Sequence, residues 1–591
     1  MNVLGISCYY HDAGAVLLRD GEVVAAAEEE RFSRRKHDSG YPRHAVEYCL
    51  AEGGIHPADL DYVGYYEKPL QKFDRILNTV LADWPWSLPV WVRSIPLWLN
   101  NRLHIGRTIQ NELGIDKDIL YCQHHLAHAA SAFLVSGFDE AAIITADGVG
   151  EWTTTAWGVG RGVEIDIRQE LRFPHSIGLL FSAVTAYLGF RVNDAEWKVM
   201  GLAPYGKPRY VDKFREVVDV RDDGSIRLNL KYFSFTHSTS RTLNRRWERL
   251  FGRPMRRPEA PLDDFHADVA ASGQKVLEDI MVKMAAHVRR QSGLDNLCLA
   301  GGVSLNCVAN WRILQESGFR RIFIQPAAGD SGGALGTAMY IYHSVLKNPR
   351  KYVMKHALLG PSFSDAQIET ALRQAGARYV HHEDADALLD AAVDLLVKGK
   401  VIGWFQGRME YGPRSLGARS LLADPRDPEM KAVINAKVKF REAFRPFAPA
   451  VTKEDAHRFF DMPEGMDAPF MLLTPQVRSE CRQLLPAITH ADGSARVQTV
   501  TPDVNPLFYR LIRKFGERTG APVLLNTSFN VRGEPIVCTP ENAYSTFLNT
   551  GIDALVIGSY LVTEKPAAVD FALGQRRSVE LEAQRRTAIA D

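Results

Sequence analysis

The chain has 591 residues, 46% of them hydrophobic and 24% charged, which is typical of a globular protein with several domains or a few large lobes. Seventy-one Lys and Arg residues balance 70 Asp and Glu residues, and the net charge of +1 disfavours nucleic acid as the main partner. Seven scattered cysteines without a CxxC pair, and a start without the regions of a signal peptide, predict a cytoplasmic protein with free thiols.

The first part of the chain carries one strand pattern twice. Residues 2–10 are predicted to form a buried strand, and residues 13–30 two strands joined by the hairpin dipeptide Asp20-Gly21. Residues 141–150 and 153–170 repeat the order of apolar strand, short turn with an aspartate, and hairpin. The repeat predicts two related lobes that face one cleft.

Residues 84–100, WPWSLPVWVRSIPLWLN, are apolar but carry three prolines and a central Arg93. A membrane-spanning helix needs about 20 largely uninterrupted apolar residues, so we expect no membrane partner. The favoured interpretation is a packed surface insertion. The alternative is an aromatic wall or lid for an apolar substrate.

Two strand–glycine–helix junctions follow, in residues 298–314 and 321–346. Glycine there lets backbone approach a ligand, and the N-terminus of the following helix favours an anion. A duplicated α/β unit of this kind is the pattern of the actin-like ATPase and sugar-kinase superfamily. Residues 347–362 lose periodicity and mark a domain boundary, and the polar residues 574–591 are predicted to be a loosely held tail.

The segment HHLAHAASAF, residues 124–133, places His124 and His128 on one face of a helix, close enough to bind one metal ion. Such a pair is also common at structural or surface positions. Asp147 and Asp330 follow predicted strands, whose carboxyl ends face the crevice of an open α/β sheet. Two imidazoles and two carboxylates would suit iron, zinc or manganese.

At this point the chain resembles the nodulation and antibiotic O-carbamoyltransferase family, which includes the tobramycin, cephamycin, novobiocin and ansamycin carbamoyltransferases. The resemblance runs from residue 1 to about residue 565. It is carried by YYHDAGA, EEERFSRRKH, HHLAHAASAF, ITADGVGEW, EWKVMGLAPYG, LAGGVSLNCVAN, QPAAGDSGGALG, GRMEYGPRSLGARSLLADPRDPEM, VKFREAFRPFAPAV and LLNTSFNVRGEPIV.

The resemblance implies an actin-like, duplicated α/β domain over residues 1–354 and a YrdC-like α/β domain over residues 355–591. The second domain would form carbamoyl-adenylate from carbamoyl phosphate and ATP. The first domain would transfer the carbamoyl group to a hydroxyl of a small-molecule, natural-product acceptor. Family position makes His124, His128, Asp147 and Asp330 the ligands of Fe(II) or another divalent metal, with Mg²⁺ as a further candidate cofactor.

Residues 408–445 are rich in arginine and lysine, and arginine's fork suits the phosphates of ATP and carbamoyl phosphate. A solvated basic face is the alternative, and Arg426 is more consistent with a structural role. The family motif favours Arg414, Lys439 and Arg445, with Lys439 and Arg445 as catalytic candidates, whereas Arg419 and Arg441 are left open between binding and structure. Asn526 and Ser528, in NTSFN after a strand, match family nucleotide contacts; a capped turn is the alternative.

Acyl transfer to a hydroxyl needs a base and a sink for oxyanion charge. His11 and Asp12, directly after the first strand, are the catalytic candidates; orientation without proton transfer is the alternative for His11. Lys198 would neutralise phosphate or pair with Glu196. Further predicted contacts on the adenosine side are Gly301, Gly302 and Asn306.

The alternative functions are a tRNA threonylcarbamoyl-type modifying enzyme and a non-catalytic actin-like nucleotide-binding regulator. The balanced charge disfavours the first, and the intact second-domain motifs disfavour the second. A metallopeptidase is disfavoured because no glutamate follows the first histidine as in HExxH. The tryptophan-rich segment makes an apolar or macrocyclic acceptor a hypothesis, and a homodimer is left open.

Overall fold

The computed structural model describes residues 1–565, so the predicted tail at residues 574–591 lies outside the described residues. The chain forms two compact units. The N-terminal unit comprises Met1–Glu29 and His37–Met354. The C-terminal unit comprises Glu30–Lys36 and the chain from Lys355 onward, so a short segment that the sequence places in the first domain groups with the second unit.

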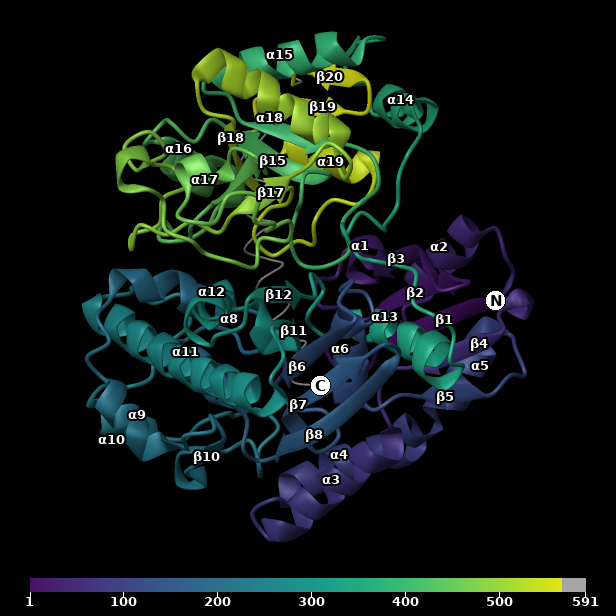
Figure 1. The fold of residues 1–591 in the computed structure, drawn as a ribbon, viewed down its shortest axis with the longest axis vertical. Helices are drawn as coiled ribbons and strands as arrows, with labels where there is room; N and C mark the ends of the chain where they lie inside the picture. Colours follow the sequence, from purple (N-terminus) through teal and green to yellow (C-terminus); the bar gives the residue numbers. More distant parts are fainter. Residues whose placement is uncertain (566–591) are drawn as a thin grey trace. The chain divides into compact units, whose positions relative to one another are not determined.

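The N-terminal unit contains two five-stranded sheets with the same topology (Figure 1). In each sheet the central strand pairs antiparallel with the nearer strand of a hairpin on one side. On the other side it pairs with a parallel strand, which in turn pairs with a second parallel strand at the edge. The repeat predicted from the sequence is therefore present. The first sheet runs β3 (Glu22–Glu28), β2 (Gly14–Arg19), β1 (Asn2–Ser7), β4 (Tyr62–Tyr65), β5 (Ile119–Tyr121), and the second β8 (Glu164–Arg172), β7 (Thr153–Arg161), β6 (Glu140–Ala146), β11 (Asn296–Ala300), β12 (Arg321–Ile324).

Two helices of small residues fill the space between these sheets. Helix α6 (His124–Phe133) packs on β6 and β11, α13 (Ser331–Met339) packs on β1 and β2, and the two helices contact each other. Their approach is close, since a Cβ added to Gly336 would overlap the backbone oxygen of Ala127. The alanines of α6 and the glycines of α13 thus let side chains from both helices reach one point.

The remaining helices of the N-terminal unit lie outside the layer that α6 and α13 form between the sheets (Figure 1). The long α11 (Asp264–Ser292) lies beside α8 (Glu196–Leu202) and α12 (Cys307–Glu316) (Figure 1). Its first turn is capped by Asp263, whose side chain accepts from the backbone N–H of His266. The other α-helices are α2 (Arg43–Gly53), α3 (Pro69–Ala82), α4 (Leu88–Asn100), α5 (Ile105–Leu113), α7 (Ile177–Tyr187), α9 (Val211–Val217) and α10 (Arg246–Phe251).

The tryptophan-rich segment forms the turn after α3 and the helix α4. Trp98 is buried, but Trp86 is 78% exposed, Val92 64% and Trp84 55%. The segment is therefore packed at the surface as expected on the side that holds Ile95 and Trp98, and its other side is exposed. Among the described residues, none of the helices combines the length and the apolar character needed to cross a bilayer.

The C-terminal unit is built on one mixed eight-stranded sheet. Helices α15 (Ala385–Val397) and α18 (Pro506–Thr519) pack against each other over a core that includes Trp404, Phe508 and Phe515. Further helices are α14 (Asp365–Gln374) and α19 (Pro540–Leu548). The strand order is β13 (Val380–His381), β20 (Tyr560–Val562), β19 (Ala554–Ile557), β14 (Ile402–Phe405), β15 (Arg419–Ala423), β18 (Val523–Ser528), β16 (Ala448–Thr452), β17 (Gln498–Val500).

Candidate functional site

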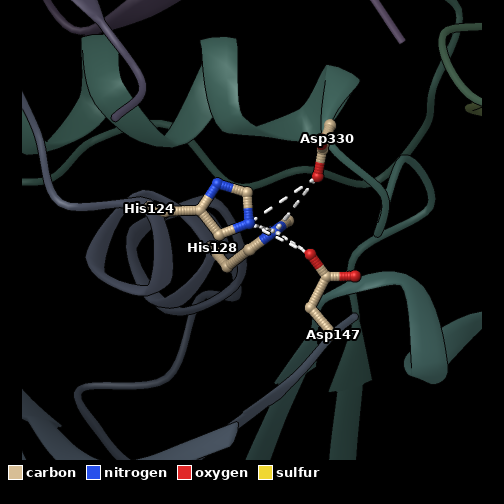
Figure 2. A group of neighbouring side chains, drawn as sticks. All are labelled: His124, His128, Asp147 and Asp330. Atoms are coloured by element: carbon tan, nitrogen blue, oxygen red, sulfur yellow. Dashed lines mark hydrogen bonds and ion pairs between the residues drawn. The ribbon is translucent and has the colours of Figure 1, made fainter. Parts of the chain in front are cut away.

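The N-terminal unit brings His124, His128, Asp147 and Asp330 together in one group (Figure 2). The two histidine Nε2 atoms lie 3.1 Å apart. Asp147 Oδ2 lies 3.0 Å from His124 Nε2 and 3.6 Å from His128 Nε2, and Asp330 Oδ1 lies 3.7 and 3.8 Å from the same atoms. One ligand atom from each of the four residues lies within 4.8 Å of the others, which is the grouping that a single metal ion requires.

Local structure explains how these four residues meet. Helix α6 begins at His124, and the Glu151 carboxylate accepts the backbone N–H of this first residue at 3.0 Å. Asp147 directly follows β6, and its Oδ1 accepts from the backbone N–H of Gly302 at 3.2 Å. Asp330 directly precedes α13, and the Tyr66 hydroxyl lies 3.5 Å from its Oδ2.

The group fits a divalent metal on chemical grounds. Both histidines are buried and direct Nε2 at the same point, yet two imidazole nitrogens 3.1 Å apart can share at most one proton between them. An ion between them would use both lone pairs. Burial lowers the pKa of His124, but hydrogen bonding to Asp147 and the charges of both aspartates outweigh it and raise that pKa to about 9. The two aspartates thus supply negative charge that stabilises a cation at this point.

His11 and Asp12 lie in the loop after β1, and both are engaged in hydrogen bonds. His11 Nδ1 lies 2.9 Å from Asp12 Oδ2, and His11 Nε2 contacts the backbone oxygen of Asn193. Asp12 Oδ1 also meets His37 Nδ1 at 2.8 Å. Neither nitrogen of His11 is therefore open to take a proton in this arrangement.

The residues predicted to contact adenosine or phosphate occupy well-defined positions in the N-terminal unit. Gly301 has a φ of +89°, and a Cβ there would overlap the backbone oxygen of Ala146, so glycine is required where β11 passes the end of β6. Asn306 caps α12 and exchanges two side-chain hydrogen bonds of 2.9 Å with Gln274. Lys198 is buried on α8 near the rings of Phe190 and Trp197.

The C-terminal unit gathers cations around Lys439. The Lys439 Nζ donates to Asn530 Oδ1 at 2.8 Å and to the Ser528 hydroxyl at 3.2 Å. Burial, together with the nearby charges of Arg441 and Arg445, lowers its pKa well below the usual value. Arg445 lies 3.6 Å from Glu442, the carboxylate that also approaches Arg532 at 3.8 Å.

Arg441, another residue of this cluster, has unused hydrogen-bonding capacity. Its Nε donates to Asn435 at 2.7 Å, whereas its buried Nη2 has no partner among the described residues. Burial and the neighbouring Arg445 lower its pKa well below the usual value. Several cations held together around one carboxylate form a site that an anion would stabilise.

Three other residues of the C-terminal unit were predicted to bind phosphate or nucleotide, and their surroundings differ from those of this cluster. Arg419 is fully buried, donates to the backbone oxygens of Gln406 and Pro361 at 2.9 Å, and stacks on Phe405. This arrangement favours a structural role over phosphate binding. Asn526 is fully buried too, and its amide donates to Gln498 at 2.8 Å; Arg414 is half-buried in the loop between β14 and β15.

Sequence reasoning missed several neighbours of these sites. His37 and Asp194 join Asp12 although they are separated from each other by 157 positions, and no spacing rule links them. Lys36 and Arg496 add charge to the cluster of the C-terminal unit. The basic run Arg34–His37 was the available signal, but it does not reveal which residues point inward.

Comparison with known proteins agrees with this organisation. The model "Carbamoyltransferase N-terminus" matches residues 2–339, and "Carbamoyltransferase C-terminus" matches residues 393–564. The chain is 46% identical to "Uncharacterized protein sll1178" of Synechocystis sp., over 95% of this chain and 97% of that protein. It is 39% identical to "Nodulation protein NolNO" of Sinorhizobium fredii, over 95% of this chain and 80% of that protein.

A further relative has a printed activity. The chain is 35% identical to the "3'-hydroxymethylcephem-O-carbamoyltransferase" of Amycolatopsis lactamdurans, over 48% of this chain and 52% of that protein. Both family models and these relatives lead to the same assignment. The chain belongs to the carbamoyltransferase family, and its relatives include nodulation proteins and a 3'-hydroxymethylcephem-O-carbamoyltransferase.

Proposed function

We propose that this protein is an ATP-dependent O-carbamoyltransferase with one half-reaction in each unit. In the C-terminal unit, which we infer to be YrdC-like, water cleaves carbamoyl phosphate to carbamate and inorganic phosphate. A carbamate oxygen then bonds to the α-phosphorus of ATP, which gives carbamoyl-adenylate as pyrophosphate departs. The N-terminal unit, which we infer to be actin-like from its duplicated sheets, moves the carbamoyl group to an acceptor hydroxyl. In this second step the hydroxyl oxygen bonds to the carbonyl carbon, its proton leaves to a base, and AMP departs.

The observation that carries the proposal is the convergence of His124, His128, Asp147 and Asp330 in a chain of the carbamoyltransferase family. These four residues would hold Fe(II) or another divalent ion. When bound, the ion would supply positive charge for a carbonyl oxygen or an adenylate phosphate. The chain's own contribution is to fix the ligand atoms on α6 and at the ends of β6 and α13.

The cation cluster of the C-terminal unit supports the adenylate half-reaction. Carbamoyl phosphate and ATP repel each other, and binding both requires fixed positive charge. Lys439, Arg441 and Arg445 lie in one cluster, and the buried Nη2 of Arg441 is directed at a position without a protein acceptor among the described residues. An anionic oxygen there would satisfy the unpaired donor and relieve the repulsion between the cations.

We infer a small-molecule acceptor with a hydroxyl group, by analogy with the printed activity of the cephem relative. The exposed face of the α3–α4 hairpin supports an acceptor with an apolar portion. Trp84, Trp86 and Val92 are each more than half exposed there, and exposed apolar side chains of this size suit contact with an apolar ligand.

The experiment separates the two half-reactions. Purified protein loaded with Fe(II) receives carbamoyl phosphate and ATP without acceptor, and mass spectrometry follows pyrophosphate and carbamoyl-adenylate. A second assay adds a panel of alcohols and follows carbamoylated product. We expect Lys439→Ala to abolish adenylate formation, and His128→Ala to leave it intact while blocking transfer.

Two outcomes would contradict the proposal in different ways. If the wild type forms neither adenylate nor carbamoylated product with any alcohol, the assignment to carbamoyl transfer fails. If His128→Ala abolishes adenylate formation as well, the division of the half-reactions between the units fails. Circular dichroism of both variants excludes unfolding as the cause.

A further inference from the structure

A continuous chain of hydrogen bonds lies outside the four-residue metal group. It begins at the backbone oxygen of Asn193, passes through His11 to Asp12 Oδ2, and continues from Asp12 Oδ1 to His37 Nδ1 at 2.8 Å. It ends where His37 Nε2 meets Asp194 Oδ1 at 2.8 Å. The four side chains therefore alternate between imidazole and carboxylate, and all belong to the N-terminal unit.

The partners determine where the protons lie. A backbone oxygen only accepts, so His11 Nε2 must carry a hydrogen. The pKa of Asp12 is held well below its usual value: burial opposes ionisation, but the two histidines outweigh burial, so Asp12 is ionised and accepts from both rings. Both nitrogens of His37 face carboxylates as well. With Asp12 and Asp194 ionised, every ring nitrogen of His11 and His37 faces an acceptor, an arrangement that suits the doubly protonated form of each ring.

Both ends of the chain return to one loop. Asn193 and Asp194 are adjacent, and Asn193 has a φ of +62°, a left-handed conformation that is uncommon outside glycine. Glu196 Oε1 accepts the backbone N–H of Asn193 at 2.8 Å and the Ser182 hydroxyl at 3.0 Å, which holds this conformation. The closed ring thus ties the loop after β1 to the start of α8.

The ring lies next to the metal group. A Cβ on Gly329 would meet Asp12 Oδ2 at 3.9 Å, so Asp12 lies beside the turn that carries Asp330. The charged groups around His37 include Asp12, Asp194 and the His11 ring, whose centroid is 4.8 Å away. Arg191 lies 3.9 Å from Asp194. A doubly protonated His11 is a fixed positive charge at this position, and it has no lone pair with which to accept a hydroxyl proton.

We propose that His37 and Asp194 are positioning residues for carbamoyl transfer, which hold Asp12 and thereby keep His11 in place as a doubly protonated imidazolium instead of a general base. The proposal rests on the proposed carbamoyl transfer in the N-terminal unit. The hydrogen bond from His37 holds Asp12 Oδ1, and this keeps Asp12 Oδ2 oriented toward His11. Asp194 orients His37 and joins it to the loop that accepts from His11.

A second metal-binding site is the competing interpretation of these residues. His11, Asp12 and His37 are close enough to form a second metal-binding group. A cation bound there would require a free lone pair on each ring and would displace a proton from each. The hydrogen bonds described above give every one of these ring nitrogens an acceptor, which favours the protonated chain.

The first test reads the protons directly and does not depend on activity. Protein labelled with ¹⁵N-histidine is titrated by NMR, with resonances assigned through His11→Gln and His37→Gln. We expect both nitrogens of His11 to be protonated at pH 7.5, and excess divalent metal to leave the His37 resonances unchanged once the four-residue group is filled. A neutral His11 at pH 7.5, or metal-dependent shifts of His37, would overturn the assignment.

The second test measures the positioning role by rescue. In His37→Ala we expect kcat for transfer to fall by about 10- to 100-fold, with little change in the acceptor KM and with adenylate formation intact. Because His37 is only partly buried, added imidazole can bridge Asp12 and Asp194, and we expect it to restore activity. Rescue should weaken as pH rises above about 7, since the imidazolium form is needed to donate to both carboxylates.

The controls separate positioning from general stability. His44→Gln removes another histidine–carboxylate pair of the same unit, His44 with Glu29 at 2.5 Å, and should leave kcat and the response to imidazole unchanged. Asp194→Asn should lower kcat without gaining from imidazole. If His37→Ala keeps kcat within twofold of the wild type, or if imidazole fails to restore it in folded protein, the positioning role is excluded. If the wild type forms no carbamoyl-adenylate at all, that result would count against the proposed function and not against the positioning role.

Discussion

His124 Nε2 lies 3.1 Å from His128 Nε2 and 3.0 Å from Asp147 Oδ2, so one imidazole nitrogen faces two groups that compete for the same proton. A metal ion resolves this competition by accepting both imidazole lone pairs and the carboxylate together. The close packing of α6 against α13 adds Asp330 to the same point.

His128→Ala and Asp330→Asn should each weaken binding of a divalent metal by at least about 100-fold, because each removes a direct ligand. Metal content after equilibrium dialysis against Fe(II), Zn(II) or Mn(II) provides the measurement. The exposed His104→Ala is the control and should retain the wild-type stoichiometry. Undiminished metal content in both ligand variants would place the ion elsewhere.

Two arginines of the C-terminal unit should respond in opposite ways. Arg441→Gln should raise the KM for ATP or carbamoyl phosphate by about 10- to 100-fold, since a charge-assisted hydrogen bond to an anion is lost. Arg419→Met should instead lower the free energy of unfolding by about 3 kcal/mol, because it leaves several buried carbonyls without a donor. Steady-state kinetics and urea denaturation measure the two effects. Equal effects of both substitutions on KM would contradict this division.

Gly301→Ala should destabilise the N-terminal unit and reduce metal affinity, because the new Cβ would overlap the backbone beside Asp147. Gly293→Ala is the matched control: Gly293 also has a positive φ, +70°, but a Cβ there meets nothing within 4 Å. The control isolates the cost of the backbone conformation, about 1 kcal/mol. Thermal unfolding and metal titration of both variants should show a clearly larger loss for Gly301→Ala.

His11 should make the stability of the protein depend on pH. Partial removal from water lowers the pKa of His11, but the charge and hydrogen bond of Asp12 outweigh this and raise it to about 10, against about 6.5 in the unfolded chain. The resulting stabilisation is complete below pH 6.5 and is lost as pH rises through 10. The deficit in Tm of His11→Gln relative to wild type should therefore shrink between pH 6.5 and pH 10. A deficit that does not change with pH would assign the loss to packing.

The exposed face of α4 and the preceding turn should affect the acceptor and not the adenylate. Trp86→Ser should raise the KM for an apolar acceptor by about tenfold, because an exposed indole can cover apolar ligand surface. Pyrophosphate release without acceptor should stay at the wild-type rate. Leu484→Ser, an exposed apolar residue of the C-terminal unit, serves as the comparison. If Trp86→Ser and Leu484→Ser have the same acceptor kinetics, this face does not contribute to acceptor binding.

Patterns that act over short distances could be predicted from the sequence. Asp20-Gly21 forms the predicted hairpin turn, with φ values of +52° and +85°, and the i, i+4 spacing places His124 and His128 on one helical face. The continuous apolar run of β6 marked the strand that Asp147 directly follows. These features depend on local geometry, which the order of residues determines directly.

Features that depend on tertiary contacts could not be predicted in this way. Arg419 and Arg441 have the same chemistry and lie 22 positions apart in one basic stretch, yet buried carbonyls surround the first and other cations the second. His37 acquires its role only when Asp194 is brought to it by the fold. Helix α4 could not be predicted because its segment contains prolines. Pro89, however, lies in the first turn of the helix, where proline is tolerated.

The seven residues Glu30–Lys36 interrupt the N-terminal unit in the sequence and belong to the C-terminal unit. There Arg34 donates to the backbone oxygens of Pro535 and Ile536, and Phe32 packs against Met409 and Cys538. During synthesis on the ribosome, these early residues must therefore wait until about 500 more have been added before their partners exist. A fragment that starts at Lys355 would lack this segment, so the gene cannot be divided between the two units by one cut; co-expression of residues 30–36 as a peptide is the simplest way to complete the excised unit.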